Sequence, residues 1–187
     1  MNLDVKDSRS NWVVRMTSHL LVQTSGKWEY YTPKPIVEAA RQLMGAIDLD
    51  PASSERANNL IVHAERFYTA KDNGLALPWT GRVWMNHPFH RQWNKDWINK
   101  LIQEYTDGNI EQACCITYAA TSEGWYRPLA RFPQLFLAPR TNYLLPDLTV
   151  LRGAQKGSVV TYLYPRKKIW QASEVFRIFK GMGDLKW

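Results

Sequence analysis

The sequence predicts a layered α/β fold, because stretches with the pattern of strands alternate with stretches that have helical periodicity. The apolar run 82–85 is the clearest strand. In the stretch 93–107 that follows, apolar residues recur at helical spacing until Gly108 ends the helix. A second apolar run, 113–118, has the pattern of a buried strand. This order of elements favours a Rossmann-like arrangement with a mixed, mostly parallel sheet.

The N-terminal half is expected to hold one further helix and two further strands. Thr32 is a good N-cap, Pro33 suits the first helical position, and Gly45 ends the helical pattern. The other elements expected here are a strand at 46–49, a helical turn at 53–59, a strand at 60–63 and a turn at 72–74. His63 lies on an apolar run and is therefore expected to be a core residue.

The C-terminal third places further elements around a long polar segment. The expected elements are a short helix at 122–130, strands at 134–138 and 158–163, and a helix at 169–180. The segment 140–157 between the two strands is polar and contains basic residues. Because long loops of this kind carry recognition more often than packing, we expect this one to contact a partner.

The length and the charge of the chain limit the class of protein. A chain of 187 residues is long enough for one domain with a substantial core. We expect that domain at 28–187, after an N-terminal extension at 1–27. The 24 Lys and Arg residues against 17 Asp and Glu residues give a formal net charge of +7. This balance favours an anionic partner such as nucleic acid, and a merely basic soluble protein is the alternative.

The cysteines and the apolar stretches bear on disulfides, metals and membranes. Cys114 and Cys115 are neighbours in an expected strand, where adjacent side chains point to opposite faces, so no disulfide is expected between them. Metal-ligand spacing is absent, and no metal is expected. No apolar stretch approaches the ~20 residues of a membrane span. The start of the chain lacks the apolar region of a signal peptide, which indicates a cytosolic protein.

The tetrapeptide Asn86-His87-Pro88-Phe89 directly follows the strand at 82–85, where open α/β sheets bind their ligands. An Asn side-chain oxygen, a backbone carbonyl kept extended by the next proline and a flat aromatic ring can hold a flipped-out nucleobase by its exocyclic amine. Asn and Pro are also common in ordinary turns, so a turn without function is the alternative for this tetrapeptide alone.

Two more motifs, Tyr31-Thr32-Pro33 and Asp50-Pro51-Ala52-Ser53, come before this tetrapeptide. In this order and spacing, the three motifs resemble those of the phage-type DNA N6-adenine methyltransferases, a small Dam-like family of phages and prophages. The resemblance covers residues 28–164. It implies a Rossmann-like, S-adenosylmethionine-dependent enzyme that acts on DNA in the cytosol of a bacterial host. His87 departs from the family pattern, which has proline there, and the turn after Asp50 lacks the glycines common in larger methyltransferases.

The resemblance implies that S-adenosylmethionine is the methyl donor. Asp50 and the turn after it would hold the methionine end, while Thr32 and Pro33 would close over it. Helix capping is the alternative role for Asp50. An acidic residue for the ribose hydroxyls is expected near the end of the next strand, where Glu65 is nearest, and Asp72 is a candidate for the cofactor adenine. The cofactor candidates are Tyr31, Thr32, Pro33, Asp50, Pro51, Ala52, Ser53, Glu65 and Asp72.

The resemblance assigns the chemistry to Asn86, His87, Pro88 and Phe89. The Asn86 side-chain oxygen and the His87 carbonyl would accept the hydrogens of the adenine amine, and Phe89 would stack on the base. Pro88 keeps His87 extended, so the carbonyl can act although His87 replaces a proline. The His87 imidazole could instead take the proton lost after methyl transfer, or it could pack in the core or contact a DNA phosphate.

Basic and polar residues after strand ends are expected to contact DNA. The candidates are His90, Arg91, Arg140, Asn142, Arg152 and Lys156. N4-cytosine methylation is an alternative, because the same two acceptors fit any exocyclic amine. The other alternative is a non-catalytic module that binds DNA or another partner. The chain has no room for a separate DNA-reading domain, so a short or relaxed recognition site is expected.

Overall fold

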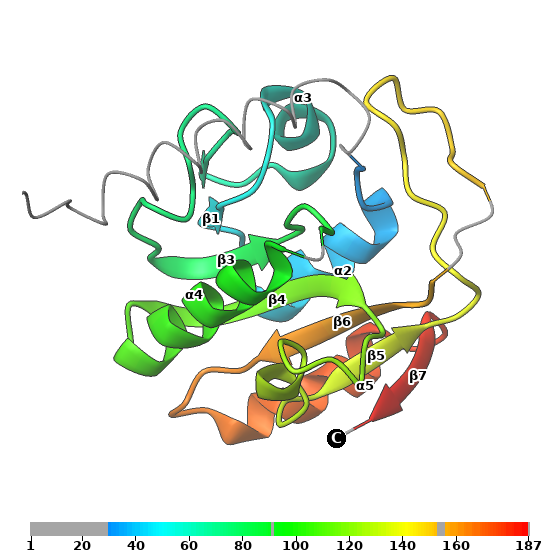
Figure 1. Cartoon of the computed structure of the whole chain (residues 1–187). Helices are drawn as coiled ribbons and strands as arrows, with labels where there is room; N and C mark the ends of the chain where they lie inside the picture. Colours follow the sequence, from blue (N-terminus) through cyan, green and yellow to red (C-terminus); the bar gives the residue numbers. More distant parts are fainter. Residues whose placement is uncertain (1–29, 91, 153–155, 187) are drawn as a thin grey trace, which may run out of the picture.

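The computed structural model describes residues 30–90, 92–152 and 156–186. The expected extension at 1–27 and the candidate Arg91 lie outside the described residues. In the described part, one mixed sheet has helices on both of its faces (Figure 1). Its strand order is β2-β1-β3-β4-β6-β5-β7. The strands are β1 (Leu49–Asp50), β2 (Arg66–Phe67), β3 (Gly81–Met85), β4 (Ile110–Tyr118), β5 (Gln134–Leu137), β6 (Ser158–Leu163) and β7 (Gly183–Lys186).

The strand order reverses next to β1. The chain runs from β1 to β2 on one side, and β3 then pairs with the other side of β1. These pairs are parallel, as is β3 with β4, whereas β6 is antiparallel to β4 and to β5, and β7 is antiparallel to β5. A mixed α/β sheet is therefore confirmed, but three of the six strand pairs in the described residues are antiparallel, so the sheet is not mostly parallel as expected. In open sheets of this kind, a reversal of strand order leaves a crevice at the carboxyl ends of the strands.

Helices α2 (Lys34–Met44) and α5 (Glu174–Ile178) pack against one face of the sheet, and α4 (Asn94–Asp107) packs against the other. Each face has its own apolar core. Successive residues of the central strands belong to one core and then to the other. Cys114 lies in the core under α2, and Cys115 lies in the core under α4. Both thiols are free. The expectation that these neighbours point to opposite faces without a disulfide is confirmed.

Glycine ends two of the predicted helices. Gly45 follows α2 with φ of 85°, and Gly108 follows α4 with φ of 81°, a left-handed conformation that favours glycine. The start of α2 differs from the expectation by one residue. Pro33 occupies the cap position, without a side-chain cap hydrogen bond, so Thr32 is not the N-cap. The Thr32 side chain is instead buried in front of the helix.

The strand predicted at 60–63 is wrong. Helix α3 (Glu55–Ala57) continues into a π-helical turn, η1 (Asn58–Val62), and the second strand of the sheet is β2, further along the chain. A short apolar run fits a strand and a buried helical turn equally well, which explains the error. His63 is exposed and ends the turn in a left-handed conformation, with φ of 48°, so it is not a core residue.

Three expectations for the C-terminal third are also corrected. The helix predicted at 122–130 consists of turns and the short 3₁₀ helix η2 (Arg127–Leu129). The helix predicted at 169–180 is divided into the 3₁₀ helix η3 (Ile169–Ser173) and α5. Strand β7 was not predicted. Gly183 begins it, at a point where a Cβ would lie 2.1 Å from the Phe136 carbonyl oxygen, so this edge pairing depends on glycine.

Candidate active site

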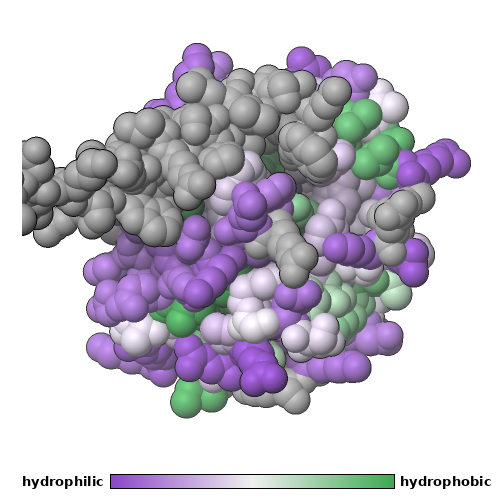
Figure 2. All heavy atoms as spheres, viewed as in Figure 1, coloured by the Kyte–Doolittle hydropathy of each residue, from purple (hydrophilic) through white to green (hydrophobic). Residues whose placement is uncertain are grey.

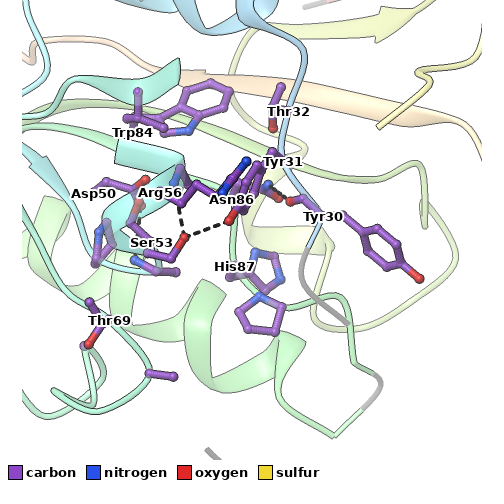
Figure 3. A pocket seen from close by; sticks show the side chains of 18 of the residues that line it. Tyr30, Tyr31, Thr32, Asp50, Ser53, Arg56, Thr69, Trp84, Asn86 and His87 are labelled. Carbon is purple, nitrogen blue, oxygen red and sulfur yellow. Dashed lines mark hydrogen bonds between the residues drawn. The ribbon is translucent and has the colours of Figure 1, made fainter. Parts of the chain in front are cut away.

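A cavity of about 500 Å³ lies at the reversal of strand order, at the carboxyl ends of β1 and β3. Three parts of the chain that are distant in sequence form its wall, and Figure 3 shows their side chains facing a common space. These are the segment before α2, the turn after β1 with α3, and the tetrapeptide after β3. The predicted site residues in the wall are Tyr31, Thr32, Asp50, Pro51, Ala52, Ser53, Asn86, His87, Pro88 and Phe89.

Asp50 ends β1 and is a buried acid in this wall, with 2% of its surface exposed. Its Oδ1 accepts a hydrogen bond of 3.1 Å from the backbone N–H of Ala52. Burial raises the pKa of Asp50 to about 7, although the hydrogen bonds from Ala52 and Ser53 act in the other direction. Among the described residues, no basic side chain forms an ion pair with it. The carboxyl group would therefore gain from a bound cation.

Asp50 does not cap the helix that follows. Ser54 is the N-cap of α3, and its Oγ accepts a hydrogen bond of 3.2 Å from the backbone N–H of Ala57. The same Oγ shares a hydrogen bond of 3.0 Å with the hydroxyl of Tyr31. The capping role considered for Asp50 thus belongs to Ser54. The bond to Tyr31 also joins α3 to the segment before α2 across the cavity wall.

Asn86 follows β3, and its side-chain amide has a defined orientation. Nδ2 donates a hydrogen bond of 2.8 Å to the backbone carbonyl of Tyr30, as Figure 3 shows. Because the nitrogen is used in this way, the amide oxygen is the atom left to face other groups in the cavity. Asn86 thus presents an acceptor, which is the group that binding an exocyclic amine requires.

The His87 side chain is buried, and its polar contacts argue against a role as a base. Nε2 lies 3.1 Å from Oδ1 of Asn94, which can only accept, so Nε2 carries the hydrogen. Nδ1 is buried without a hydrogen-bond partner among the described residues. Burial lowers the pKa of His87 to about 4, while the bond to Asn94 acts in the other direction. The imidazole is therefore neutral at pH 7 and packs between the rings of Phe89 and Trp97.

Phe89 belongs to an aromatic cluster at the edge of the cavity. Its ring centroid lies 4.4 Å from that of Tyr118 and 5.9 Å from that of Tyr143. The Nζ atom of Lys156 lies 5.1 Å from the centre of the Tyr118 ring. The structure thus brings a candidate DNA-binding cation next to the expected stacking residue, from the loop that leads into β6.

Three predicted cofactor residues are not in the cavity wall. Pro33 caps α2, and Glu65 is exposed before β2, because this strand begins later than expected. Thr69, Ala70 and Lys71 line the cavity after β2 instead. Asp72 is exposed, and its Oδ2 accepts hydrogen bonds of 2.8 and 2.7 Å from N and Oγ1 of Thr69. Its observed contacts are those of a turn residue.

The turn that contains Asp72 supports the site indirectly. Gly74 packs against the turn after β1 so closely that a Cβ would lie 2.0 Å from the Pro51 carbonyl oxygen. The Gly74 carbonyl in turn accepts a hydrogen bond of 2.8 Å from Nε1 of Trp79, which is fully buried. A buried tryptophan and a glycine therefore hold the Asp50 turn in place.

Several cavity residues were missed from the sequence. Tyr30 supplies the carbonyl that orients Asn86, Arg56 lines the cavity from α3, and Pro146 lines it from the loop between β5 and β6. Arg56 is two residues after Ser54, so recognition of Ser54 as an N-cap would have placed it near the site. No local pattern indicates Tyr30 or Pro146, because both reach the cavity through contacts between distant segments.

The candidate DNA-binding residues lie in two places. His90 follows the tetrapeptide, and its ring is 4.4 Å from that of Trp93. Arg140, Asn142, Arg152 and Lys156 are exposed on the loop between β5 and β6. This loop joins the cavity wall through Pro146.

The described part of the chain has no candidate metal site and no candidate membrane span. No cluster of three or more His, Cys, Asp or Glu side chains is placed to hold a metal ion there. No helix among residues 30–90, 92–152 and 156–186 is long and apolar enough to cross a membrane.

Comparison with known proteins identifies the family. Residues 17–132 match the family model described as DNA N-6-adenine-methyltransferase (Dam). The match begins inside the stretch 1–27 and includes the three motifs that form the cavity wall. No curated protein matches the chain. Because the match spans more than half of the sequence, the chain belongs to the Dam family and is a DNA N6-adenine methyltransferase.

Proposed function

We propose that the chain transfers a methyl group from S-adenosylmethionine to N6 of an adenine that has been flipped out of DNA. The observation that carries this proposal is that one cavity joins the turn after Asp50 to the tetrapeptide at Asn86. A volume of about 500 Å³ is within the range of small-molecule sites. The strand order around it supports a Rossmann-like methyltransferase domain at 28–187.

The residues around Asp50 suit the methionine end of S-adenosylmethionine. A buried carboxyl group with a raised pKa and no basic partner among the described residues favours the positive charges of this ligand. Thr32, on the opposite segment, has a buried Oγ1 without a hydrogen-bond partner in the described structure, which can bind a polar ligand atom. When bound, S-adenosylmethionine supplies a methyl group on a sulfonium, so no protein nucleophile is needed.

The target amine is assigned to Asn86 and to the backbone of His87. The adenine amine is a poor nucleophile because its lone pair is delocalised into the ring. Two acceptors aimed at its hydrogens draw that pair back onto nitrogen. The orientation of Asn86 supports this role, because its nitrogen is occupied by Tyr30. Preorganised polar groups of this kind contribute on the order of 10²- to 10³-fold in rate. Phe89 would stack on the base.

The imidazole of His87 is assigned a packing role. Its Nε2 is used by Asn94, and its Nδ1 is buried away from solvent. The resemblance to phage enzymes further suggests a gene carried by a phage or prophage and a site of action in the bacterial cytosol.

The test is methylation of unmethylated genomic DNA with S-adenosylmethionine that carries an isotopic methyl label. Digestion to nucleosides and mass spectrometry then identify the product. The expected product is N6-methyl-2′-deoxyadenosine, and it should be absent with Asn86→Ala. Asn99→Ala, an exposed residue on α4, is the matched control and should retain activity. Labelled N4-methyl-2′-deoxycytidine, or no labelled nucleoside after treatment with a folded protein that binds DNA, would contradict the proposal.

A further inference from the structure

The loop between β5 and β6 has an apolar tip at the edge of the cavity. Leu148, Val150 and Leu151 have 40%, 48% and 38% of their surface exposed, and we call these three side chains the apolar tip. Figure 2 shows a hydrophobic patch at the upper right, where Figure 1 places this loop, among hydrophilic side chains. Exposed apolar side chains that cluster on one loop indicate a contact surface.

Backbone contacts fix the tip relative to the catalytic tetrapeptide. Leu144 and Tyr31 exchange two backbone hydrogen bonds, of 2.8 and 2.9 Å. Tyr31 follows Tyr30, whose carbonyl binds Asn86. Leu144 also forms an antiparallel bridge with Val150, so the tip extends from a small hairpin. The path from Asn86 to the tip thus runs through hydrogen-bonded backbone.

The hairpin also forms part of the cavity wall. Pro146, in its turn, lines the cavity, and Arg56 is among the charges that lower the pKa of Asp147, after the hydrogen bonds from Thr149. Arg56 itself lines the cavity from α3. The turn of the hairpin is therefore part of the cavity wall, and Leu148 follows Pro146 by two residues.

The tip holds Leu148 in an unusual backbone conformation. Its φ of 68° lies in the left-handed region, which β-carbon sterics disfavour for leucine and which glycine or asparagine adopts more readily. Nothing in the turn requires a large apolar side chain, since that side chain is 40% exposed. An exposed leucine kept at such a position is consistent with a role in contact with a ligand.

The charges around the tip identify the kind of partner. Arg140 and Arg152 are exposed on the two arms of the loop, and Lys156 is exposed where the second arm meets β6. An apolar tip between cationic arms suits a DNA duplex, whose phosphates would meet the arms while the tip meets the stacked bases. The formal net charge of +7 agrees with this partner.

We propose that the apolar tip inserts between base pairs of duplex DNA and occupies the space that the target adenine leaves when it enters the cavity. This inference rests on the proposed function. Insertion offsets part of the loss of stacking that base flipping costs. Methylation of duplex DNA should therefore depend on the tip, whereas methylation of a strand whose bases are already unpaired should depend on it little.

The test compares methyl incorporation into duplex genomic DNA and into the same DNA after heat denaturation. Leu148→Gly removes the side chain and suits the left-handed backbone, so it should not destabilise the fold. Leu151→Asn is a second variant of the tip. Each should reduce methylation of duplex DNA by more than tenfold and that of denatured DNA by less than twofold. Phe176→Asn, at a residue 43% exposed on α5, is the matched control and should change neither.

Equal losses on the two substrates, or unchanged activity on duplex DNA, would overturn the proposal. A second measurement is independent of methylation. Insertion between base pairs unwinds closed circular DNA, so plasmid relaxed by a topoisomerase with the wild-type protein should show a changed linking number, and Leu148→Gly should remove that change. Unwinding by a protein that methylates neither substrate would refute the proposed function and keep the tip assignment, whereas absence of unwinding would refute the tip assignment.

Discussion

Nδ2 of Asn86 donates a hydrogen bond of 2.8 Å to the carbonyl of Tyr30, which lies 56 positions earlier in the chain. This bond orients the amide at the end of β3 and attaches the segment before α2 to the cavity. The same segment is bonded to the β5–β6 loop through Tyr31 and Leu144. One side chain therefore links the proposed chemistry to the proposed DNA contact.

Asn86→Asp is expected to lower both activity and melting temperature. Aspartate keeps an oxygen that can accept from the target amine, but it places a second oxygen against the Tyr30 carbonyl where a donor is needed. Asn86→Ala should abolish methylation and keep the fold. Thermal unfolding and methyl incorporation measure the two effects, with Asn99→Asp on the exposed face of α4 as the control. Full activity of Asn86→Asp would show that the bond to Tyr30 does not orient the amide.

Asp50→Asn should weaken binding of S-adenosylmethionine by more than tenfold, since loss of a charged partner costs about 2 kcal/mol. Because the pKa of Asp50 is about 7 without ligand, a cationic ligand should expel its proton, and wild-type affinity should rise with pH around 7. Calorimetry at pH 6 and 8 measures this change. Asp50→Asn controls for the titration of the ligand itself. An equal pH dependence of affinity in the wild type and in Asp50→Asn would show that Asp50 is not the group whose titration changes the affinity.

Asp50 also has an effect on stability without ligand. Its pKa is raised from 3.8 to about 7 on folding, so its favourable contribution is complete below pH 3.8 and is lost as the pH rises through 7. Asp50→Asn should therefore stabilise the ligand-free protein above pH 7 relative to the wild type. Denaturant unfolding at pH 5 and pH 8 provides the measurement. A variant that is less stable at pH 8 would contradict the buried, unpaired carboxylate.

His87→Pro should retain methylation, because it keeps the backbone carbonyl. It should also lose roughly 1–3 kcal/mol of stability, because Oδ1 of Asn94 is left buried without its donor. With a pKa of about 4, His87 should give no inflection in the wild-type rate between pH 6 and 7. Rates measured from pH 5.5 to 8.5 at saturating S-adenosylmethionine, where the pH dependence of cofactor affinity no longer contributes, decide this. An inactive proline variant together with an inflection in the parent would make the imidazole the proton acceptor.

Replacing Arg140, Arg152 or Lys156 by alanine should reduce the salt dependence of DNA binding. Each phosphate contact that is removed lowers the slope of log affinity against log salt by about 0.9. Lys168→Ala is the control, because this exposed lysine precedes η3 and lies outside the loop. Fluorescence anisotropy with a labelled duplex over a range of salt concentrations gives the slopes. Variant slopes equal to the wild-type slope would show that the loop does not contact DNA phosphates.

Strong local periodicity allowed much of the fold to be predicted. Helix α4 and strands β3, β4 and β6 follow from apolar spacing, and Gly45 and Gly108 follow from the conformation that ends a helix. The order of three motifs was enough to predict the family. These features depend on residues that are neighbours in the chain, so the sequence contains them directly.

The tertiary structure decided features for which local patterns are ambiguous or silent. The apolar run at 60–63 is a helical turn because α2 and η1 pack together, and this later start of β2 leaves Glu65 outside the cavity. The partner of His87 is Asn94, across the start of α4, so burial makes the imidazole a neutral packing group. The Tyr30 carbonyl and Pro146 reach the cavity only through pairing between segments far apart in sequence. The sequence by itself determined the strongly periodic elements and the motifs, while the short elements and the environment of each side chain depended on contacts that form only when the whole sheet is assembled.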